Sequence, residues 1–363
     1  MTLRARTTES DNRGRPLVSA ILAVRNEERY IRAVLKSLLL QECSNCTLEI
    51  IVVDGDSSDK TQAIVECISA EDTRVKLLLN KKKKTPFAFN LGILAAQGEY
   101  VCILGAHTTY ANNYIEACLE ELGVRRAGGC SGRVITRPGA GGLEALLIAW
   151  AMSHPFGTSS GSTRTRGAGF WDTIPYPLFL KSTVLEVGAY DNELHRNQDN
   201  DLNQRLRARG HKLYITDKTY CELRVSPNLR ALAVYAFRTG FWNFISIKKN
   251  AASMSVRHFA PGLFAFALFT SLLAFSMAAS MASVMSLWLR APLFIVVGAY
   301  GTTAAIASLQ IGCREKAPAA LLLPFIFGLL HLAYGLGTLY ALVRNARVPS
   351  SEHPTATTFE TSG

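Results

Sequence analysis

The sequence lacks several features that would assign it to other protein classes. Residues 1–15 are polar and the first apolar run, Leu17 to Val24, is short, so we expect no secretory signal and reduced cysteines. Cys43 and Cys46 form a C-x-x-C pair without the second pair of a zinc site, which favours an ordinary loop. Charged residues are scarce from about Phe259 onward, which is a membrane composition rather than that of a soluble core.

The positive charge of the chain does not point to nucleic acid. Lys and Arg number 39 against 28 Asp and Glu, a net charge of +11, but they are scattered and no nucleic-acid-binding module is recognisable. Two exceptions are the run Lys81–Lys84 and a group beside the apolar third, Lys248, Lys249 and Arg257. A basic face next to a hydrophobic segment favours anionic lipid headgroups and a diphosphate substrate. We therefore predict membrane lipids as partners and no nucleic acid.

Strands and helices alternate along the first part of the chain. The pattern predicts strands at 17–24, 48–53, 75–79 and 99–104, separated by helices at 31–39, 61–68 and 87–96. Continuous apolar strands joined by helices are typical of a doubly wound, mainly parallel sheet covered on both faces. In such sheets ligands bind at the carboxyl ends of the strands, which selects the loops at 25–27, 54–59 and 105–107.

The middle of the chain is less regular. A segment rich in Gly, Ser, Thr and Arg, residues 128–169, surrounds an apolar helix at 143–152 and predicts a region that covers the substrate. Helical spacing resumes at 178–187, and strands are expected at 213–215 and 219–225.

Three apolar stretches end the chain: Phe259–Leu289, Ala291–Ile311 and Ala317–Val343. Each exceeds the roughly 20 residues that a membrane-spanning helix needs. Cations before the first stretch and between the second and third, Arg314 and Lys316, place the large domain in the cytoplasm by the positive-inside rule, and three crossings would put the C-terminus outside.

These observations predict four regions. They are a disordered leader at 1–15, a catalytic domain at 16–250, a membrane domain of three transmembrane helices at 251–345 and a disordered tail at 346–363.

The acidic loop Asp54–Asp59 resembles a calcium loop but lacks the later Gly and the terminal Glu of an EF-hand. Alone, it reads as a solvated turn that caps the next helix. Together with Val24–Glu28 before it and Asn90–Tyr100 after it, the segment Val52–Thr61 resembles the family 2 glycosyltransferases in order and spacing. The resemblance implies a GT-A fold, a nucleotide-sugar donor and a C-terminal transmembrane helical anchor.

The resemblance also implies donor contacts. In those enzymes the first strand loop and the Asp-Gly-x-Ser-x-Asp loop hold the nucleotide, here through Arg25, Glu27, Asp54 and Asp56, of which Asp54 is the firmer match.

A basic residue followed by Asn lies near the diphosphate in the same family. The matching positions are Asn90 and one residue of the run before it, for which we take Lys84. The remaining lysines of that run are expected to form a solvated face.

A metal-binding motif of the form Asp-x-Asp or Asp-x-His follows the fourth strand in the family. Here Gly105 replaces the leading Asp, so His107 remains as the one protein ligand from this motif for Mn²⁺ or Mg²⁺. The alternative is that His107 is a hydrogen-bonded loop residue.

Three further segments, His107–Tyr110, Trp171–Pro175 and His331–Gly337, resemble the ExoA-type subgroup of succinoglycan and exopolysaccharide biosynthesis. That resemblance implies a UDP-hexose donor and a polyprenyl-diphosphate-linked saccharide as acceptor.

The general base is expected in the segment 196–202, where Asp199 takes the family's base position and Gln198 replaces its usual Glu. One carboxylate that removes the acceptor proton fits an inverting displacement rather than a retaining pair. The alternative makes Asp199 a helix N-cap, with Asp201 pairing Arg205.

On the acceptor side, Arg238 and Trp242 stand in place of the family's Gln-x-x-Arg-Trp segment. An interfacial Trp that anchors a membrane helix is the alternative for Trp242.

We thus expect an inverting family 2 glycosyltransferase, multi-pass in the inner membrane with its catalytic domain in the cytoplasm, acting in exopolysaccharide or cell-surface glycan synthesis. Because Gly105 and Gln198 depart from the family pattern, a catalytically weakened scaffold that binds nucleotide-sugar is the first alternative. A polyprenyl-phosphate sugar synthase is the second.

Overall fold

The computed structural model describes residues 14–278 and 284–344. Its strands form one mixed sheet in the order β3-β2-β1-β4-β8-β6-β9-β5, with β7 paired to β9. The strands are β1 (Leu17–Val24), β2 (Thr47–Asp54), β3 (Val75–Leu79), β4 (Tyr100–Gly105), β5 (Thr108–Tyr110), β6 (Gly129–Arg137), β7 (Gly169–Trp171), β8 (Leu178–Leu180) and β9 (Leu213–Arg224). The tail expected at 346–363, and all but the last two residues of the leader, lie outside the described residues.

Helices cover both faces of this sheet and extend beyond it. They are α1 (Ile31–Leu39), α2 (Thr61–Glu71), α3 (Thr85–Ala95), α4 (Tyr114–Val124), α5 (Leu143–Met152), α6 (Pro155–Thr158), α7 (Lys181–Glu186), α8 (Gln198–Ala208), α9 (Leu229–Lys249), α10 (Ala260–Ala278), α11 (Val284–Glu315) and α12 (Leu323–Val343). Short 3₁₀ turns are η1 (Ala251–Ser253), η2 (Val256–Phe259) and η3 (Pro318–Leu322).

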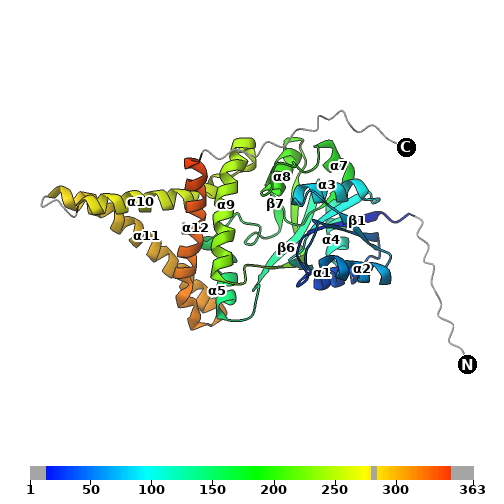
Figure 1. The fold of residues 1–363 in the computed structure, drawn as a ribbon, viewed down its shortest axis with the longest axis horizontal. Coiled ribbons are helices and arrows are strands. Elements are labelled where there is room, and N and C mark those ends of the chain that lie inside the picture. Colours follow the sequence, from blue (N-terminus) through cyan, green and yellow to red (C-terminus); the bar gives the residue numbers. More distant parts are fainter. Residues whose placement is uncertain (1–13, 279–283, 345–363) are drawn as a thin grey trace, which may run out of the picture.

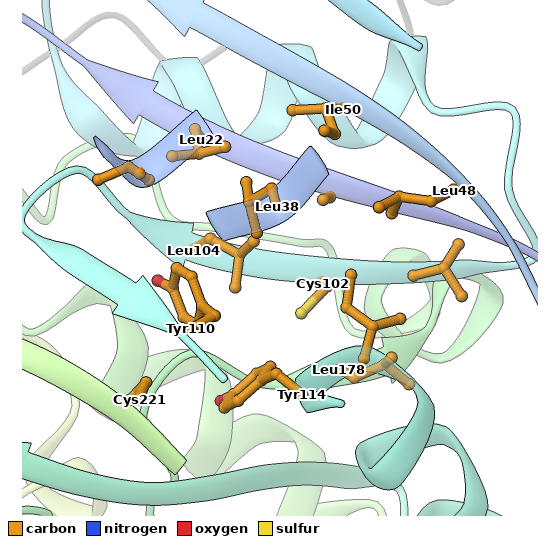
Figure 2. Close-up of a cluster of buried hydrophobic side chains, with 14 of the residues drawn as sticks. Leu22, Leu38, Leu48, Ile50, Cys102, Leu104, Tyr110, Tyr114, Leu178 and Cys221 are labelled. Carbon is orange, nitrogen blue, oxygen red and sulfur yellow. The ribbon is translucent and has the colours of Figure 1, made fainter. Parts of the chain in front are cut away.

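The first half of the sheet is the parallel, doubly wound unit that the sequence predicts. Strands β1 to β4 all run in the same direction, with β1 between β2 and β4. Alternate side chains of these strands enter two cores on opposite faces, as the alternation of side chains along a strand requires. Figure 2 shows one of them, where Leu22 and Leu104 of neighbouring strands meet Leu38 of α1. The carboxyl ends of β1, β2 and β4 therefore share one edge.

The second half departs from the sequence prediction in two places. Residues 213–215 and 219–225 belong to a single strand, β9, whose pairing with β6 shifts register after Gly132. The expected helix at 178–187 begins as the strand β8, which pairs antiparallel with both β4 and β6, and only then turns into α7. Pairing with distant strands, which local spacing does not report, decides both cases.

Three C-terminal helices are long and apolar enough to cross a membrane. Figure 1 shows α10 and α11 pointing away from the sheet domain, whereas α12 lies beside α9 and runs steeply across α10. The sequence prediction placed a helix end near residue 290, but α11 continues through Pro292 to Glu315. A single proline removes one backbone donor, which does not have to end a helix.

Small residues bring α9 and α12 into close contact. A Cβ at Gly240 of α9 would lie 2.0 Å from the carbonyl oxygen of Tyr334, and one at Gly337 of α12 would lie 2.0 Å from that of Phe237. Neither position has room for a side chain, so the two backbones touch along their length. This contact joins the catalytic domain to the apolar helices.

Candidate active site

The loops after β1 and β2 are tied together into one rigid surface. The Asn26 amide N–H donates to Ser57 Oγ (2.9 Å), and the Ser58 N–H donates to Asn26 Oδ1 (2.8 Å). The Glu27 N–H donates to Thr61 Oγ1 (2.7 Å) at the start of α2. Because these bonds join loops far apart in sequence, the expected nucleotide-binding residues share one pre-organised edge.

Asp54 stabilises this surface through hydrogen bonds to its own loop and to α2. Its buried carboxylate accepts from the Ser57 N–H (2.8 Å), from Ser57 Oγ (2.6 Å) and from Gln62 Nε2 (2.6 Å). The carboxylate is thus committed to shaping its own loop. Direct contact between Asp54 and a nucleotide stays a prediction.

Asp56 and Arg25 form the exposed part of the same surface. Asp56 has a left-handed backbone (φ 59°) and forms an ion pair with Lys83, which lowers the pKa of its carboxyl. The Arg25 side chain lies over Gly55, where a Cβ would be 3.4 Å from two of its carbons. Both side chains are open to a ligand.

His107 does not stand alone at the end of β4. Its Nε2 lies 3.1 Å from Glu27 Oε1, and its ring meets Tyr30 edge-on with centroids 5.0 Å apart. Burial lowers the pKa of His107, while burial and the nearby Asp59 raise the pKa of Glu27 to about 7. The hydrogen-bonded loop alternative therefore describes part of what His107 does, with Glu27 as its partner.

Tyr176 fills the space that the missing acidic residue would need. A Cβ on Gly105 would lie 2.7 Å from Tyr176 Cε1, closer than packed carbon atoms come. Burial raises the pKa of Tyr176, and the charge of Asp199 contributes, so Asp199 lies within electrostatic range of this ring. The ring therefore lies against the end of β4.

The donor atoms present fit a metal ion that is shared with a diphosphate. Among the described residues no three His, Cys, Asp or Glu side chains cluster to hold an ion by themselves. His107 and Glu27 supply two neighbouring donors. Mg²⁺ commonly takes one or two protein ligands and completes its shell with substrate phosphates and water.

Asp199 occupies the first turn of α8. Its side chain is solvent-exposed, yet the surrounding protein limits hydration of the carboxylate and raises its pKa to about 6. The Tyr190 hydroxyl offsets part of this increase. A carboxylate that is accessible and more basic than usual is suited to accept a proton at neutral pH.

The N-cap alternative for Asp199 does not fit the helix start. The cap position belongs to Asn197, whose backbone is left-handed (φ 62°) and whose side chain caps no helical N–H. The other half of that alternative is observed, because the Asp201 carboxylate accepts from Arg205 Nε (2.9 Å) and also from Asn250 Nδ2 (2.7 Å). Asp201 is buried and fully used in this structural contact.

Asn90 connects α3 to the loop before α8. Its amide nitrogen donates to the Tyr190 carbonyl (2.8 Å) and to Asn192 Oδ1 (3.1 Å), and its oxygen accepts from the Tyr190 N–H (2.9 Å). With its amide engaged at both ends, Asn90 positions the segment that leads to Asp199. Contact between Asn90 and a diphosphate stays a prediction.

Lys84 is exposed at the start of α3. Burial lowers the pKa of His195, and the nearby charge of Lys84 lowers it further. Lys84 therefore lies toward the loop that precedes α8, within electrostatic range of His195, four residues before Asp199.

Arg238 and Trp242 lie one turn apart on α9. The Trp242 ring contacts His195, with centroids 5.3 Å apart. Burial and the charge of Arg238 lower the pKa of Arg196. Both predicted acceptor-side residues therefore border the segment that carries Asp199.

The sequence pattern missed three residues near this segment: Tyr176, Tyr190 and Arg164. They lie in or beside irregular segments, where no periodic spacing marks them. The signal that could have found Arg164 is its place in the Arg-rich segment 128–169.

Comparison with known families agrees with this geometry. Residues 19–175 match the model of Glycosyl transferase family 2. Over these residues the chain is similar to the family 2 glycosyltransferases.

Two curated relatives extend the match toward the C-terminus. The succinoglycan biosynthesis protein ExoA of Rhizobium meliloti (strain 1021) is 26% identical over 243 residues, which cover 66% of this chain and 70% of the relative. A dolichyl N-acetyl-alpha-D-glucosaminyl phosphate 3-beta-D-2,3-diacetamido-2,3-dideoxy-beta-D-glucuronosyltransferase of Methanococcus voltae is 25% identical over 249 residues, 63% of this chain and 76% of the relative. The relatives confirm the expected family and the ExoA-type resemblance.

A solved structure shares the fold over most of the chain. This structure is the mannosyltransferase PcManGT from Pyrobaculum calidifontis in complex with GDP-Man and Mn²⁺. The match covers 93% of this chain and 90% of the mannosyltransferase chain. The TM-score is 0.57 at 18% identity, which establishes the GT-A fold.

Proposed function

We propose that this protein is an inverting glycosyltransferase that moves a hexose from a nucleotide-sugar, UDP-linked, to a polyprenyl-diphosphate-linked saccharide. The observation that carries this proposal is Asp199, an accessible carboxylate with a pKa raised to about 6. It lies in a helix start that Asn197 ties to α9, within electrostatic range of the Tyr176 ring beside Gly105. The acceptor hydroxyl loses its proton to Asp199 as it attacks the anomeric carbon, and the nucleoside diphosphate leaves.

The inverting stereochemistry is supported by the number of available carboxylates. The other acid on the same turn, Asp201, is buried and bound by Arg205 and Asn250. A retaining mechanism through a covalent intermediate needs a second free carboxylate as nucleophile. Gln198 cannot serve as one.

The donor is proposed to lie across the loops after β1, β2 and β4. Arg25, Asp54 and Asp56 face the nucleotide, Lys84 faces the diphosphate, and Glu27 with His107 would hold a divalent ion. An ion held there would supply positive charge to neutralise the diphosphate. The Mn²⁺ and GDP-Man of the solved mannosyltransferase support such a site in this fold.

The proposed location is the cytoplasmic face of the inner membrane. Lys249, Arg257, Arg314 and Lys316 lie near the ends of α9, α10 and α11 that adjoin the catalytic domain, which supports a cytoplasmic domain.

The arrangement supports two crossings instead of the expected three. α9 carries cations along its length, namely Arg230, Arg238, Lys248 and Lys249. Such a helix belongs at the headgroup level. Because α12 touches α9 along its length, α12 lies at the same level with its exposed apolar side toward the lipid. The hairpin of α10 and α11 then makes the crossings.

A direct test is to incubate the purified full-length protein in lipid nanodiscs with UDP- and GDP-sugars and a polyprenyl-diphosphate-linked saccharide. Mass spectrometry of the lipid product then identifies the reaction. Transfer to polyprenyl monophosphate alone would identify the synthase alternative, and donor binding without product would identify the scaffold alternative.

A further inference from the structure

A pocket of about 540 Å³ lies between the catalytic domain and the apolar helices. Its wall includes Asn197 and Asn200, which flank Asp199 in sequence, and Tyr334 of α12 at the membrane side. The pocket therefore extends from the turn that carries the proposed base to the apolar helices.

One side of this pocket carries a cation without a counter-charge. Arg164 forms no ion pair within the described part of the chain, and its buried Nε has no hydrogen-bond partner there. Its nearest polar contact is the Tyr235 hydroxyl, 3.3 Å from Nη2. A guanidinium shielded from water without an anion is costly unless a ligand supplies one.

A neighbouring arginine pair shows what compensation looks like in the same region. Arg166 is fully buried and is paired with Asp172, which also accepts from Arg257 Nη2 (3.1 Å). Arg257 also lines the pocket, and among the described residues that line it there is no Asp or Glu. Arg164, Arg166 and Arg257 thus share this region with one carboxylate, that of Asp172, which leaves an excess positive charge near the pocket.

Aromatic and apolar side chains, mainly from the C-terminal helices, form another part of the lining. Phe264 of α10 stacks on Tyr300 of α11 with ring centroids 4.3 Å apart, and Phe156 meets Tyr300 with centroids 5.5 Å apart. Leu330 of α12 completes this side. A ligand that fits both parts of the lining has an anionic head and a long apolar chain.

A nucleotide-sugar matches only half of this description. It has a diphosphate but no apolar chain, and the loops that match its binding motif lie at the ends of β1 and β2. An isoprenoid phosphate has both parts, and its head would lie beside the turn that carries Asp199.

We propose that this pocket binds the isoprenoid-phosphate end of the lipid-linked acceptor, with Arg164 and Arg257 on the phosphate oxygens. This inference rests on the proposed function and adds the residues that read the lipid. The bound phosphate supplies the anion that Arg164 lacks. The saccharide attached to it is then directed toward Asp199.

The test measures binding of farnesyl diphosphate to the full-length protein in detergent by calorimetry. Arg164→Gln should weaken this binding about tenfold or more, because it removes a charge-assisted hydrogen bond to the phosphate. UDP affinity should not change. The matched control is Arg209→Gln. Arg209 is an exposed arginine at the carboxyl end of α8 that pairs with Glu186 of α7, and its removal should leave both affinities unchanged.

The ligand series checks the apolar part of the lining without altering the protein. Farnesyl diphosphate should bind more tightly than geranyl diphosphate, and inorganic diphosphate should bind weakest. An equal affinity for all three would overturn the inference. Displacement of farnesyl diphosphate by phosphatidylglycerol at equal concentration would assign the pocket to bulk anionic lipid and would also overturn it.

Failure of this inference can be separated from failure of the proposed function. An Arg164→Gln enzyme that transfers sugar with an unchanged KM for the lipid acceptor refutes the pocket assignment and leaves the glycosyltransferase intact. If Arg164→Gln loses farnesyl diphosphate binding but the wild-type protein transfers no sugar, the pocket assignment stands and the proposed glycosyltransferase function is refuted. The melting temperature of the Arg164→Gln protein should be no lower than that of the wild type, since an unpaired buried charge has been removed.

Discussion

Asn197 and Asn243 join the turn that carries the proposed base to helix α9. The Asn197 amide donates to Asn243 Oδ1 (2.7 Å) and to Ser246 Oγ (3.0 Å), and Asn243 in turn donates to the Tyr334 hydroxyl of α12. The left-handed backbone of Asn197, which asparagine tolerates well, aims this amide at α9. The start of α8 is therefore held directly by the layer of helices next to the lipid.

Asp199→Asn should separate binding from chemistry. Because only the proton acceptor is lost, we expect turnover to fall about a hundredfold or more while donor affinity stays near wild type. Calorimetry with UDP and mass spectrometry of the lipid product measure the two on one preparation. Asp201→Asn is the matched control: it weakens a buried contact with Arg205 and should lower the melting temperature more than Asp199→Asn does. Near wild-type turnover of Asp199→Asn would end the base assignment.

The pH dependence of turnover should report the same carboxylate. With a pKa of about 6, Asp199 is protonated and inactive below that pH, so kcat at saturating donor should rise through pH 6 and level off above it. The folded-state pKa is raised above the ordinary carboxyl value, so the free energy of unfolding should fall as pH rises from about 4 to about 6. Asp199→Asn should remove that decrease. A kcat profile without an inflection between pH 5 and 7 would contradict the assignment.

His107→Ala should weaken metal-supported donor binding. With Glu27 left as the one neighbouring donor among the described residues, we expect UDP affinity in Mn²⁺ to drop about tenfold, measured by calorimetry with and without EDTA. His211→Ala, which alters a histidine packed against Gly128, is the control and should bind UDP as wild type does. Equal UDP affinity of the wild-type protein in Mn²⁺ and in EDTA would remove the metal from the mechanism.

Gly105→Asp restores the family residue but should not fit. The new Cβ meets Tyr176 Cε1 at 2.7 Å, so the ring must move, and we expect a loss of about 1–3 kcal/mol in unfolding free energy. The same substitution should cost less in a Tyr176→Ala background, since the obstructing ring is gone. Chemical denaturation of the two single variants and the double variant measures this coupling. Additive losses would mean that Tyr176 is not what excludes a side chain at position 105.

The C-terminus should lie on the same side of the membrane as the catalytic domain. Cys313, exposed near the end of α11, is a built-in marker of the cytoplasmic end of the hairpin. In sealed vesicles, a membrane-impermeant maleimide should label Cys313 from one side of the membrane only. Protease should remove a C-terminal tag from that same side. Labelling of the two from opposite sides would show that α12 crosses the membrane. Release of the protein by carbonate alone would contradict any crossing.

The local pattern of apolar residues was sufficient to predict β1 to β4 with α1 to α3, because these strands are short apolar runs, mostly buried on both faces, that alternate with helices and are bounded by polar loops. The same pattern, read together with the polar residues that follow each strand, identified the loops at 25–27, 54–59 and 105–107. Their shared position follows from parallel strands ending at one edge.

Only the tertiary structure decided which partners these residues meet. Tyr176 comes from a loop far from Gly105 in sequence, yet it fills the space that an acidic side chain would need. Hydropathy likewise marked α12 as long and apolar enough to cross a membrane, but its contact with α9 depends on Gly240 and Gly337, which meet only after folding. Spacing along a chain reports the period of one element, whereas distances between elements depend on how their faces pack.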